Sequence, residues 1–497
     1  MSVDTNNAAF QDALNLIQYT RQSVFLTGKA GTGKSTFLRY VCENTKKKHV
    51  VLAPTGIAAI NAGGSTMHSF FKLPFYPLLP DDPNLSLQRG RIHEFFKYTK
   101  PHRKLLEQIE LVIIDEISMV RADIIDAIDR ILRVYSHNLR EPFGGKQLLL
   151  VGDVFQLEPV VKNDEREILN RFYPTPYFFS ARVFGQIDLV SIELQKVYRQ
   201  TDPVFVGVLD HIRNNTAGAA DLQLLNTRYG SQIEESEADM YITLATRRDT
   251  VDSINEKKLA ELPGDPITFE GVIEGDFPES SLPTSQELVL KPGAQIIFIK
   301  NDFDRRWVNG TIGVIAGIDE EEETIYVITD DGKECDVKRE SWRNIRYRYN
   351  EKTKEIEEEV LGSFTQYPIR LAWAITVHKS QGLTFSRVVI DFTGGVFAGG
   401  QAYVALSRCT SLDGIQLKKP INRADVFVRP EIVNFAGRFN DRQAIDKALK
   451  QAQADVQYAA ASRAFDKGDM EECLEQFFRA IHSRYDIEKP IPRRFIR

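Results

Sequence analysis

The sequence has few cysteines and lacks long apolar segments. Only four cysteines occur in 497 residues, and none of them forms a CxxC pair. This excludes a disulfide-stabilised scaffold and leaves no cysteine pattern for a zinc site. No apolar run approaches the ~18–20 residues that a membrane-spanning helix needs. The first residues, MSVDTNNAAFQDAL, show neither a secretory signal nor an arginine-rich transit pattern, so we expect a reduced, intracellular setting without a membrane.

An overall excess of positive charge is also missing. The chain has 63 basic and 69 acidic residues, a formal net charge of −6, which argues mildly against a nucleic-acid partner. The acidity is local, because residues 261–360 hold 24 acidic and only 12 basic residues, and the rest of the chain is net positive. We therefore predict that the acidic runs Asp319–Glu323 and Glu357–Glu359 face solvent, away from any bound strand.

Short apolar runs alternate with helical patterns in two long parts of the chain. In the first 190 residues, SVFLTG, HVVLAPTG, LVIIDE and QLLLVGD each end in small or acidic residues, and helical periodicity separates them. A second set begins near residue 195 and includes YITLAT and RVVIDFT. Strands that alternate with helices predict an α/β fold with parallel sheets.

Three other segments interrupt or follow these two sets. Residues 72–100 are rich in proline and indicate a small surface insertion. Residues 290–365 alternate short β-type runs with turns, which predicts a small all-β module. The tail, residues 431–497, is helical, and AASRAFDKGDMEECLEQFFRAI has the spacing of one tetratricopeptide-like hairpin. An amphipathic helix pair packed on the body of the protein is an equally good interpretation of this tail.

One glycine-rich segment carries a specific chemical signal. Residues 28–35, GKAGTGKS, fit the pattern GxxxxGK[ST] between a predicted strand and a predicted helix. Backbone N–H groups of such a loop bind phosphates at a helix N-terminus. Lys34 is expected to reach the β- and γ-phosphates of ATP, and Ser35 to hold Mg²⁺. The nucleotide-binding residues predicted here are Ala30, Gly31, Thr32, Gly33, Lys34, Ser35 and Thr36.

Further candidates follow the later strands. Asp115 and Glu116 end the run LVIIDE, where the first carboxylate is expected to hold Mg²⁺ and the second to act as general base. Gln156 follows the next run, and its amide suits a γ-phosphate sensor. Arg199 and Arg408 are candidate arginine fingers, because a guanidinium neutralises charge in phosphoryl transfer.

These motifs occur together with others in a fixed order over residues 8–415. The ordered segments are GKAGTGKST (28–36), APTGIAAINAGGSTMHSFF (53–71), VIIDEISM (112–119), GDVFQLEP (152–159), VYRQ (197–200), ITVHKSQGLTF (375–385) and YVALSRCTS (403–411). The set resembles the petite-integration-frequency (PIF) DNA helicases, which are RecD-like members of superfamily one, B branch. Glu158 departs from the pattern, since the family usually has proline after the Gln-Leu pair.

The resemblance implies an α/β architecture of two RecA-like P-loop domains with ATP between them. The first domain is expected over residues 1–190 with a wedge insertion at about 72–100. The second is expected over 191–430 with an inserted Src-homology-3-type β-barrel at about 290–365, followed by the helical tail. By the same resemblance, Gln11 is a candidate adenine-reading glutamine and Gly382 a candidate nucleotide contact.

The resemblance also places DNA-binding residues in one motif of each domain. They are Thr55, Ser65, Thr66, His68 and Phe70 in the first domain, and Thr376, His378, Lys379 and Gln381 in the second. Hydroxyls, amides and basic groups hold the phosphate backbone in such grooves, and aromatic rings stack on bases. Two alternatives stay open, since either histidine suits a structural role and Phe70 is equally suited to core packing.

The implied activity is an ATP-dependent 5′-to-3′ DNA helicase that moves along single-stranded DNA. Implied substrates are tailed or forked duplexes, RNA–DNA hybrids and G-quadruplexes, with roles in DNA replication, repair and recombination. Two other functions fit the same sequence: a translocase that displaces bound proteins, and an ATP-gated nucleic-acid-binding scaffold. We further expect a monomer in a bacterial-type cytoplasm, associated with the nucleoid, and a possible protein partner for the tail.

Overall fold

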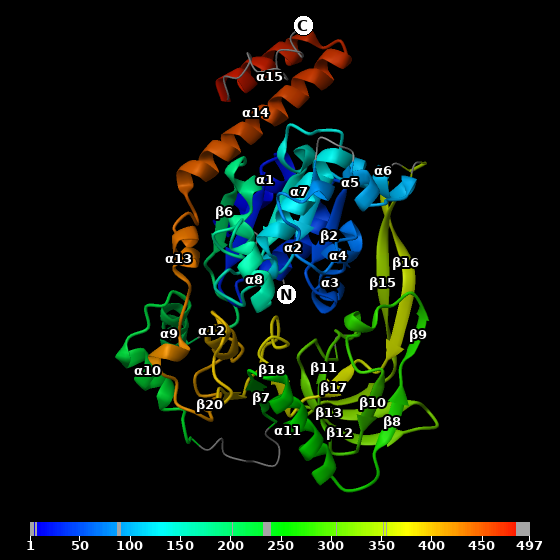
Figure 1. Ribbon diagram of the computed structural model, residues 1–497, viewed down its shortest axis with the longest axis vertical. Coiled ribbons are helices and arrows are strands. Elements are labelled where there is room, and N and C mark those ends of the chain that lie inside the picture. Colours follow the sequence, from blue (N-terminus) through cyan, green and yellow to red (C-terminus); the bar gives the residue numbers. More distant parts are fainter. Residues whose placement is uncertain are drawn as a thin grey trace.

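The computed structural model describes residues 4, 7–86, 91–200, 202–231, 240–304, 306–350, 352–353 and 355–483. Two lobes lie one above the other, with the N-terminal third of the chain in the upper lobe (Figure 1). The middle of the chain forms the lower lobe, and the last two helices project from the top of the molecule (Figure 1). None of the helices in these residues combines the length and hydropathy needed to cross a bilayer.

The upper lobe is built on a six-stranded parallel sheet in the order β3-β2-β4-β5-β1-β6. Nearly every residue of its longer strands is buried, as expected for a sheet with both faces covered. The strands are β1 (Val24–Gly28), β2 (His49–Ala53), β3 (Ser65–Thr66), β4 (Leu111–Ile114), β5 (Gln147–Val151) and β6 (Val190–Leu194). The helices around them are α1 (Ala8–Tyr19), α2 (Lys34–Asn44), α3 (Gly56–Ala62), α4 (Met67–Phe71), α7 (Ala122–Tyr135) and α8 (Asn163–Leu169).

The proline-rich insertion of this lobe packs into its core. It contains α5 (Arg91–Phe95), and α6 (Lys100–Gln108) follows it. Buried Leu73, Leu78 and Ile92 belong to the same apolar cluster as α7. The Leu78 N–H also donates to a carboxylate oxygen of Asp123 at 3.0 Å. The insertion is therefore anchored at several points, with residues 87–90 outside the described part of the chain.

The lower lobe contains a second parallel sheet, in the order β18-β7-β19-β20. Its strands are β7 (Ile242–Ala245), β18 (Ala374–Thr376), β19 (Val388–Asp391) and β20 (Ile415–Leu417). The helices of this domain are α9 (Pro203–Arg213), α10 (Ala219–Asn226), α11 (Arg248–Glu261) and α12 (Gln401–Leu406). The predicted α/β fold with two parallel-sheet domains is confirmed.

A small antiparallel β module interrupts the second domain. Its five-stranded sheet has the order β14-β13-β12-β11-β17, and β8 pairs with β10 beside it. The strands are β8 (Ile267–Glu270), β10 (Glu287–Leu290), β11 (Gln295–Phe298), β12 (Ile312–Asp319), β13 (Thr324–Thr329), β14 (Glu334–Val337) and β17 (Ile369–Leu371). Phe298 stacks on Trp307 in its core, at 4.4 Å between ring centroids. Residues 320–323 are exposed, as predicted for this acidic run.

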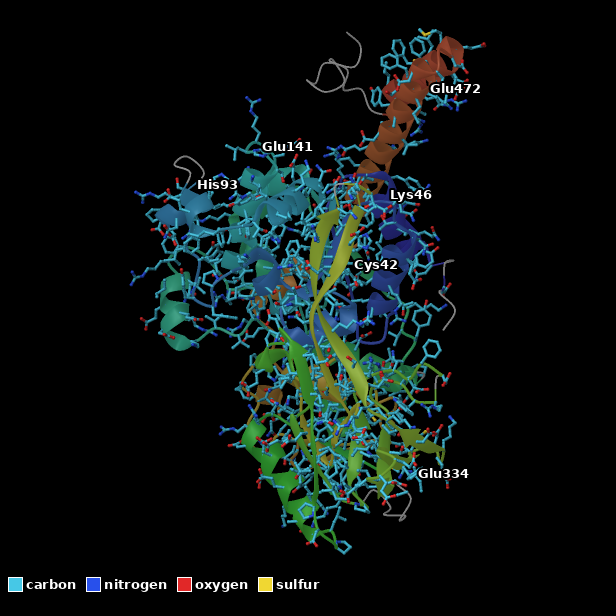
Figure 2. The ribbon with its side chains drawn as sticks, turned by 90° about the vertical axis from the view of Figure 1, so that its right-hand side faces the viewer. Cys42, Lys46, His93, Glu141, Glu334 and Glu472 are labelled. Carbon is cyan, nitrogen blue, oxygen red and sulfur yellow. The ribbon has the colours of Figure 1, made fainter. Side chains whose placement is uncertain are left out.

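Residues 340–366, which the sequence analysis includes in the β module, form a separate long hairpin. Its strands β15 (Glu340–Asn350) and β16 (Glu355–Gln366) pair with each other, and β16 pairs with β9 (Val272–Gly275). The hairpin runs from the lower lobe along the upper lobe, past Cys42 toward Lys46 (Figure 2). Alternation along β15 puts Tyr347 and Tyr349 on one face, and both rings are buried in the first-domain core. On the other strand, Glu357 and Glu358 of the acidic run are exposed, whereas Glu359 is partly buried and pairs with Arg346 at 2.8 Å.

The tail begins as part of the first domain. Helix α13 (Pro430–Ala436) packs there, and Phe435 stacks on Phe179 with ring centroids 4.3 Å apart. Helix α14 (Arg442–Asp466) lays Ile445 and Ala448 against the cluster that contains α1. Beyond that point α14 pairs with α15 (Met470–Ser483) in a hairpin that projects from the body, with Glu472 at its outer end (Figure 2). The tail thus combines both interpretations offered by the sequence, a helix packed on the body and a free hairpin.

The remaining regular elements are single 3₁₀ turns. They are η1 (Pro83–Leu85), η2 (Ile117–Met119), η3 (Pro142–Gly145), η4 (Phe178–Ser180), η5 (Arg182–Gly185), η6 (Glu279–Ser281) and η7 (Arg423–Asp425). Residues 484–497, the end of the predicted tail, lie outside the described residues.

We predict that the position of a C-terminal truncation decides whether the first domain folds. A chain ending at residue 429 loses Phe435, whose ring also lies 5.7 Å from that of Phe25. Phe435 is partly buried against the first-domain core, and the truncation also removes Ile432, which is fully part of that core. Loss of a buried isoleucine costs about 2–5 kcal/mol, a large share of the stability of a domain, and loss of Phe435 adds to it. The melting temperature and the yield of soluble protein should therefore fall sharply for the chain of residues 1–429. A chain ending at residue 450 keeps these contacts and should melt within a few degrees of the full chain. Wild-type melting of the shorter chain would contradict this prediction.

Candidate nucleotide-binding and DNA-binding sites

The phosphate-binding loop joins β1 to α2 at the carboxyl edge of the first sheet. Gly31 and Gly33 adopt φ values of 79° and 89°, which glycine reaches without strain. The Lys34 ammonium donates to the carbonyls of Gly28 at 2.7 Å and Lys29 at 3.0 Å. No side chain caps the N-terminus of α2, so its first N–H groups are available to an anion.

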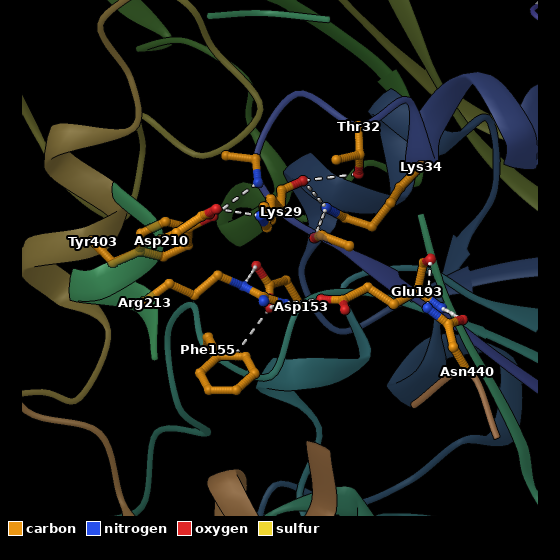
Figure 3. A network of polar contacts seen from close by, with 12 residues as sticks. Lys29, Thr32, Lys34, Asp153, Phe155, Glu193, Asp210, Arg213, Tyr403 and Asn440 are labelled. Carbon is orange, nitrogen blue, oxygen red and sulfur yellow. Dashed lines mark hydrogen bonds and ion pairs between the residues drawn. The ribbon is translucent and has the colours of Figure 1, made fainter. Parts of the chain in front are cut away.

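The predicted nucleotide-binding residues, Ala30 to Thr36, all lie in this loop and in the first turn of α2. The Thr32 hydroxyl donates to the Lys29 carbonyl at 2.9 Å and closes the loop, whereas Ser35 is exposed. The Ala30 N–H donates to the hydroxyl of Tyr403, a second-domain residue, at 2.9 Å. Lys29 forms an ion pair with Asp210 of α9 (Figure 3). The second domain therefore contacts the phosphate-binding loop at two points.

Asp115 and Glu116 follow β4 at the same sheet edge. Glu116 has φ 50°, a left-handed conformation that is uncommon for this residue type, and its N–H donates to the Asp115 carboxylate at 2.9 Å. Burial, and secondarily the charge of Asp115, raise the pKa of Glu116 to about 7. Burial also raises the pKa of Asp115. A carboxyl group poised near neutral pH suits the predicted role of Glu116 as general base.

The predicted sensor Gln156 lies in a turn after β5. Its N–H donates to the Asp153 carbonyl at 2.9 Å, and its side chain is buried. Asp153 in turn is bound by Arg213, the last residue of α9, with nitrogen–oxygen distances of 3.1 and 3.3 Å. Sequence reasoning missed Arg213, because nothing near it in the sequence identifies its partner 60 residues earlier.

The two candidate arginine fingers differ in their surroundings. Arg199 packs on the phosphate-binding loop so closely that a Cβ at Gly31 would lie 2.4 Å from its own Cβ. Arg408 is 1% exposed, and its guanidinium donates to carbonyls of its own domain, including Val404 at 2.9 Å. Burial, and then the charge of Arg199, lower the pKa of Arg408 to about 9. Arg199 thus meets the loop with its backbone and Cβ, while its guanidinium also donates to a second-domain carbonyl, that of Ser407, at 3.3 Å. The charge of Arg408 acts against the raised pKa of Glu116, so both arginines belong to the surroundings of this site.

An aromatic residue beside Arg199 also faces the nucleotide site. The Tyr198 N–H donates to the Gly31 carbonyl at 2.9 Å, and its ring lies 3.9 Å from a Cβ built at Gly33. The ring is 43% exposed, which leaves a face open for stacking. Its position in the motif VYRQ was the sequence signal that could have identified it.

The two other predicted nucleotide contacts lie outside the loop. Gln11 lies on α1, and the Gly382 carbonyl accepts a hydrogen bond from Arg199 at 3.5 Å.

The first-domain DNA motif divides into exposed and buried residues. Thr55 and Thr66 cap α3 and α4, and their hydroxyls lie at accessible helix starts. His68 stacks on Phe75, a ring that is 83% exposed and that sequence reasoning missed. Phe70, in contrast, is 4% exposed within the first-domain core. Phe70 therefore cannot stack on a base, which corrects the sequence-based prediction.

Ser65 requires a similar correction. It lies on β3, paired with β2, and its side chain is 7% exposed. The alternation of β3 turns Ser65 into the core and leaves Thr66 at the surface. Ser65 therefore supports the motif rather than contacting a strand.

The second-domain DNA motif follows β18 and is rich in unpaired donors. The Gln381 amide nitrogen is buried and has no hydrogen-bond partner within the described residues. Lys379 is exposed, His378 is half-buried, and the Thr376 hydroxyl accepts from the Lys379 N–H at 3.2 Å. Arg370 on β17 lies near Lys379, since its charge lowers the pKa of that lysine after the larger effect of burial. Sequence reasoning missed Arg370, whose side chain has no hydrogen bond or ion pair among the described residues, although its backbone pairs with β11.

Glu158, the departure from the family pattern, has a structural partner. Its carboxylate forms two bonds with the Arg429 guanidinium, at 2.6 and 3.1 Å, and accepts from the Tyr177 hydroxyl at 3.0 Å. Arg429 directly precedes α13, so Glu158 holds the start of the tail against the first domain.

Comparisons with known proteins agree with this geometry. A model of the PIF1-like helicase family matches residues 4–211. The ATP-dependent DNA helicase Pif1 of Campylobacter jejuni is 33% identical over 412 residues, which cover 80% of this chain and 88% of that protein.

Solved structures add a comparison of domain arrangement. Bacteroides sp Pif1 in complex with ADP-AlF4 superposes with a TM-score of 0.80 at 41% identity, covering 88% of this chain and 97% of that one. The same protein bound to single-stranded DNA has a TM-score of 0.63 at 41% identity, covering 89% and 99%. Unliganded Pif1 from Bacteroides sp superposes almost as well as the ADP-AlF4 complex, with a TM-score of 0.78 at 41% identity, covering 88% of this chain and 97% of that one. The arrangement here is therefore more similar to these two structures than to the complex with single-stranded DNA. From these similarities and the ordered motifs, the chain belongs to the PIF1-like helicase family.

Proposed function

We propose that this protein is an ATP-dependent DNA helicase that moves 5′ to 3′ along single-stranded DNA. The observation that carries the proposal is the contact between Arg199 and Gly31 of the phosphate-binding loop, in a chain whose two domains each carry one candidate DNA motif. Relatives named ATP-dependent DNA helicase Pif1 support the activity, and so do the solved relatives with ADP-AlF4 and single-stranded DNA.

Hydrolysis is assigned to groups at the junction of the two domains. The loop N–H groups and Lys34 bind the phosphates, Glu116 accepts a proton from the attacking water, and Arg199 neutralises charge on the γ-phosphoryl group. A hydroxyl and a carboxylate are ligands that Mg²⁺ accepts, so Ser35 and Asp115 fit the metal. Mg²⁺ would supply charge neutralisation at the phosphates.

Movement along DNA follows from the two DNA motifs. Nucleotide binding closes the domains and brings the motif of Thr66 toward that of Thr376, and product release separates them again. Alternating affinity of the two motifs then moves the strand through the groove in one direction. Forked duplexes are proposed substrates, supported by a solved Pif1 structure described as the structural basis for DNA unwinding at forked duplex DNA by two coordinating Pif1 helicases. RNA–DNA hybrids and G-quadruplexes, and roles in repair and recombination, are proposed from the family resemblance.

The projecting hairpin is proposed to contact a protein partner. Met470, Leu474 and Phe478 recur every four residues on α15 and are each about half exposed. Such a stripe is suited to the apolar face of a partner helix. The chain itself is proposed to be a monomer without DNA, and sedimentation that shows a stable dimer would count against this.

The direction of movement is tested with tailed duplexes. We expect the protein to unwind a duplex with a 5′ single-stranded tail in an ATP-dependent reaction and to leave a 3′-tailed duplex intact. Single-stranded DNA should also stimulate ATP hydrolysis. Equal unwinding of both substrates, or hydrolysis that ignores DNA, would contradict the proposal.

Substitutions in the nucleotide site should abolish unwinding. Glu116→Gln removes the base but keeps the shape, and loss of a general base costs about 10²–10⁴-fold in rate. Lys34→Ala should reduce both ATP binding and hydrolysis. Lys46→Ala is a matched control, because this exposed lysine lies outside the loop. Steady-state hydrolysis and unwinding of the 5′-tailed duplex provide the measurement, and a wild-type rate in either site variant would refute the assignment.

Arg370→Gln should weaken DNA binding in a salt-dependent way. If Arg370 contacts one phosphate, its loss should reduce the slope of log K against log salt by about 0.7 for single-stranded DNA. Fluorescence anisotropy with labelled oligo(dT) at several salt concentrations gives this slope. As a control, Arg140→Gln removes an exposed arginine just before η3 and should leave the slope of log K against log salt unchanged. An unchanged slope for Arg370→Gln would remove this residue from the DNA groove.

A further inference from the structure

The end of α9 contacts two loops of the first domain at once. Asp210 pairs with Lys29 in the phosphate-binding loop, and Arg213, three residues later, pairs with Asp153 in the sensor turn (Figure 3). Residues three apart lie on the same side of a helix, so one rigid element of the second domain reaches both loops. Arg199 and Arg408 have no such double contact in the described part of the chain.

Arg213 is held by charge on several sides. Its guanidinium lies 3.1 Å from Asp153 and 2.8 Å from Glu193, a residue of β6, and 4.3 Å from the centre of the Phe155 ring. The Arg213 side chain is 3% exposed. Five donors in one plane allow arginine to bridge two carboxylates, which a lysine ammonium cannot do with the same geometry. Arg213 therefore fixes Asp153 against both β6 and the second domain.

The sensor turn is organised around the carboxylate that Arg213 binds. The Phe155 N–H donates to Asp153 Oδ1 at 3.2 Å, and the Gln156 N–H donates to the Asp153 carbonyl at 2.9 Å. The second domain touches this turn again at Gly400, where a Cβ would lie 2.2 Å from the Gln156 carbonyl oxygen. The backbone of the sensor turn at Gln156 is thus in direct contact with the second domain.

We propose that Arg213 is a positioning residue that makes the sensor turn depend on domain closure. In the domain arrangement of this structure, Arg213 holds Asp153 and so supports the turn that carries Gln156. When the domains separate, α9 withdraws Arg213 from both carboxylates, and the turn loses this support. Hydrolysis is then restricted to the closed arrangement, which links ATP use to movement on DNA. This inference rests on the proposed helicase activity.

The test compares Arg213→Met with the wild-type chain in steady-state ATP hydrolysis and in unwinding of a 5′-tailed duplex. The phosphate-binding loop remains intact, so KM for ATP should stay within about twofold. Misplacement of Gln156 should lower kcat in the presence of oligo(dT) by about 10-fold or more. Stimulation by DNA should fall, and more ATP should be consumed for each duplex unwound.

Two further variants separate positioning from mere stabilisation. Arg133→Met removes another buried arginine, which pairs with Asp129 at 2.8 Å on α7, and should lower the melting temperature without changing DNA stimulation. Arg213→Lys keeps the charge and should restore folding and part of the stimulation, so it carries the test if Arg213→Met does not fold. The proposal is overturned if both Arg213 variants lower the melting temperature but keep wild-type stimulation and ATP consumption per duplex. A wild-type chain without DNA-stimulated hydrolysis would instead refute the proposed function itself.

Discussion

The nucleotide site depends on one geometric constraint, namely that the strands of a parallel sheet all end at the same edge. Gly28 ends β1, Asp115 follows β4, and the sensor turn follows β5, and these are neighbours in the order β4-β5-β1. Each strand is buried on both faces, so a shift by one residue would exchange the side chains that pack against the two covering layers of helices. The core therefore fixes the relative positions of the loop, the acidic pair and the sensor before any ligand binds.

The junction between the domains combines ion pairs with apolar contacts. Lys29–Asp210 and Arg213–Asp153 join the two domains, while Ala30 and Leu157 of the first domain pack in the second-domain apolar cluster. Separating the ion pairs exposes both partners to water, which recovers the hydration that burial removed. Polar contacts between domains are thus compatible with the repeated opening that movement on DNA requires.

Local patterns were enough to propose the nucleotide site, because its candidate residues lie in short contiguous segments. The phosphate-binding loop, Asp115–Glu116 and Arg199 could be identified without knowledge of tertiary contacts. The direction of side chains could not be identified in this way. Phe70 and Ser65 belong to the DNA motif, yet tertiary packing turns both into the core. Pairs such as Arg213 with Asp153 were also out of reach, since their partners are set by how the two domains meet.

The same reason explains the differences in architecture. The alternation in β15 predicted a strand but not that its tyrosines would pack on another domain. Residues after 430 had the pattern of amphipathic helices, but nothing local showed that Phe435 completes the first-domain core. Both cases concern contacts between segments more than 200 residues apart, which periodicity alone does not encode.

The hairpin β15–β16 and helix α13 have a consequence for the order in which the protein folds on the ribosome. The core around β1 and α7 is built from residues 25–183, yet it also includes Tyr347, Tyr349 and Ile432. A nascent chain therefore exposes part of this apolar surface until more than 400 residues have been made. At about 5–20 residues per second, this interval lasts on the order of ten seconds or more. The N-terminal domain can therefore complete its core only near the end of synthesis. Until then its exposed apolar surface needs protection by chaperones.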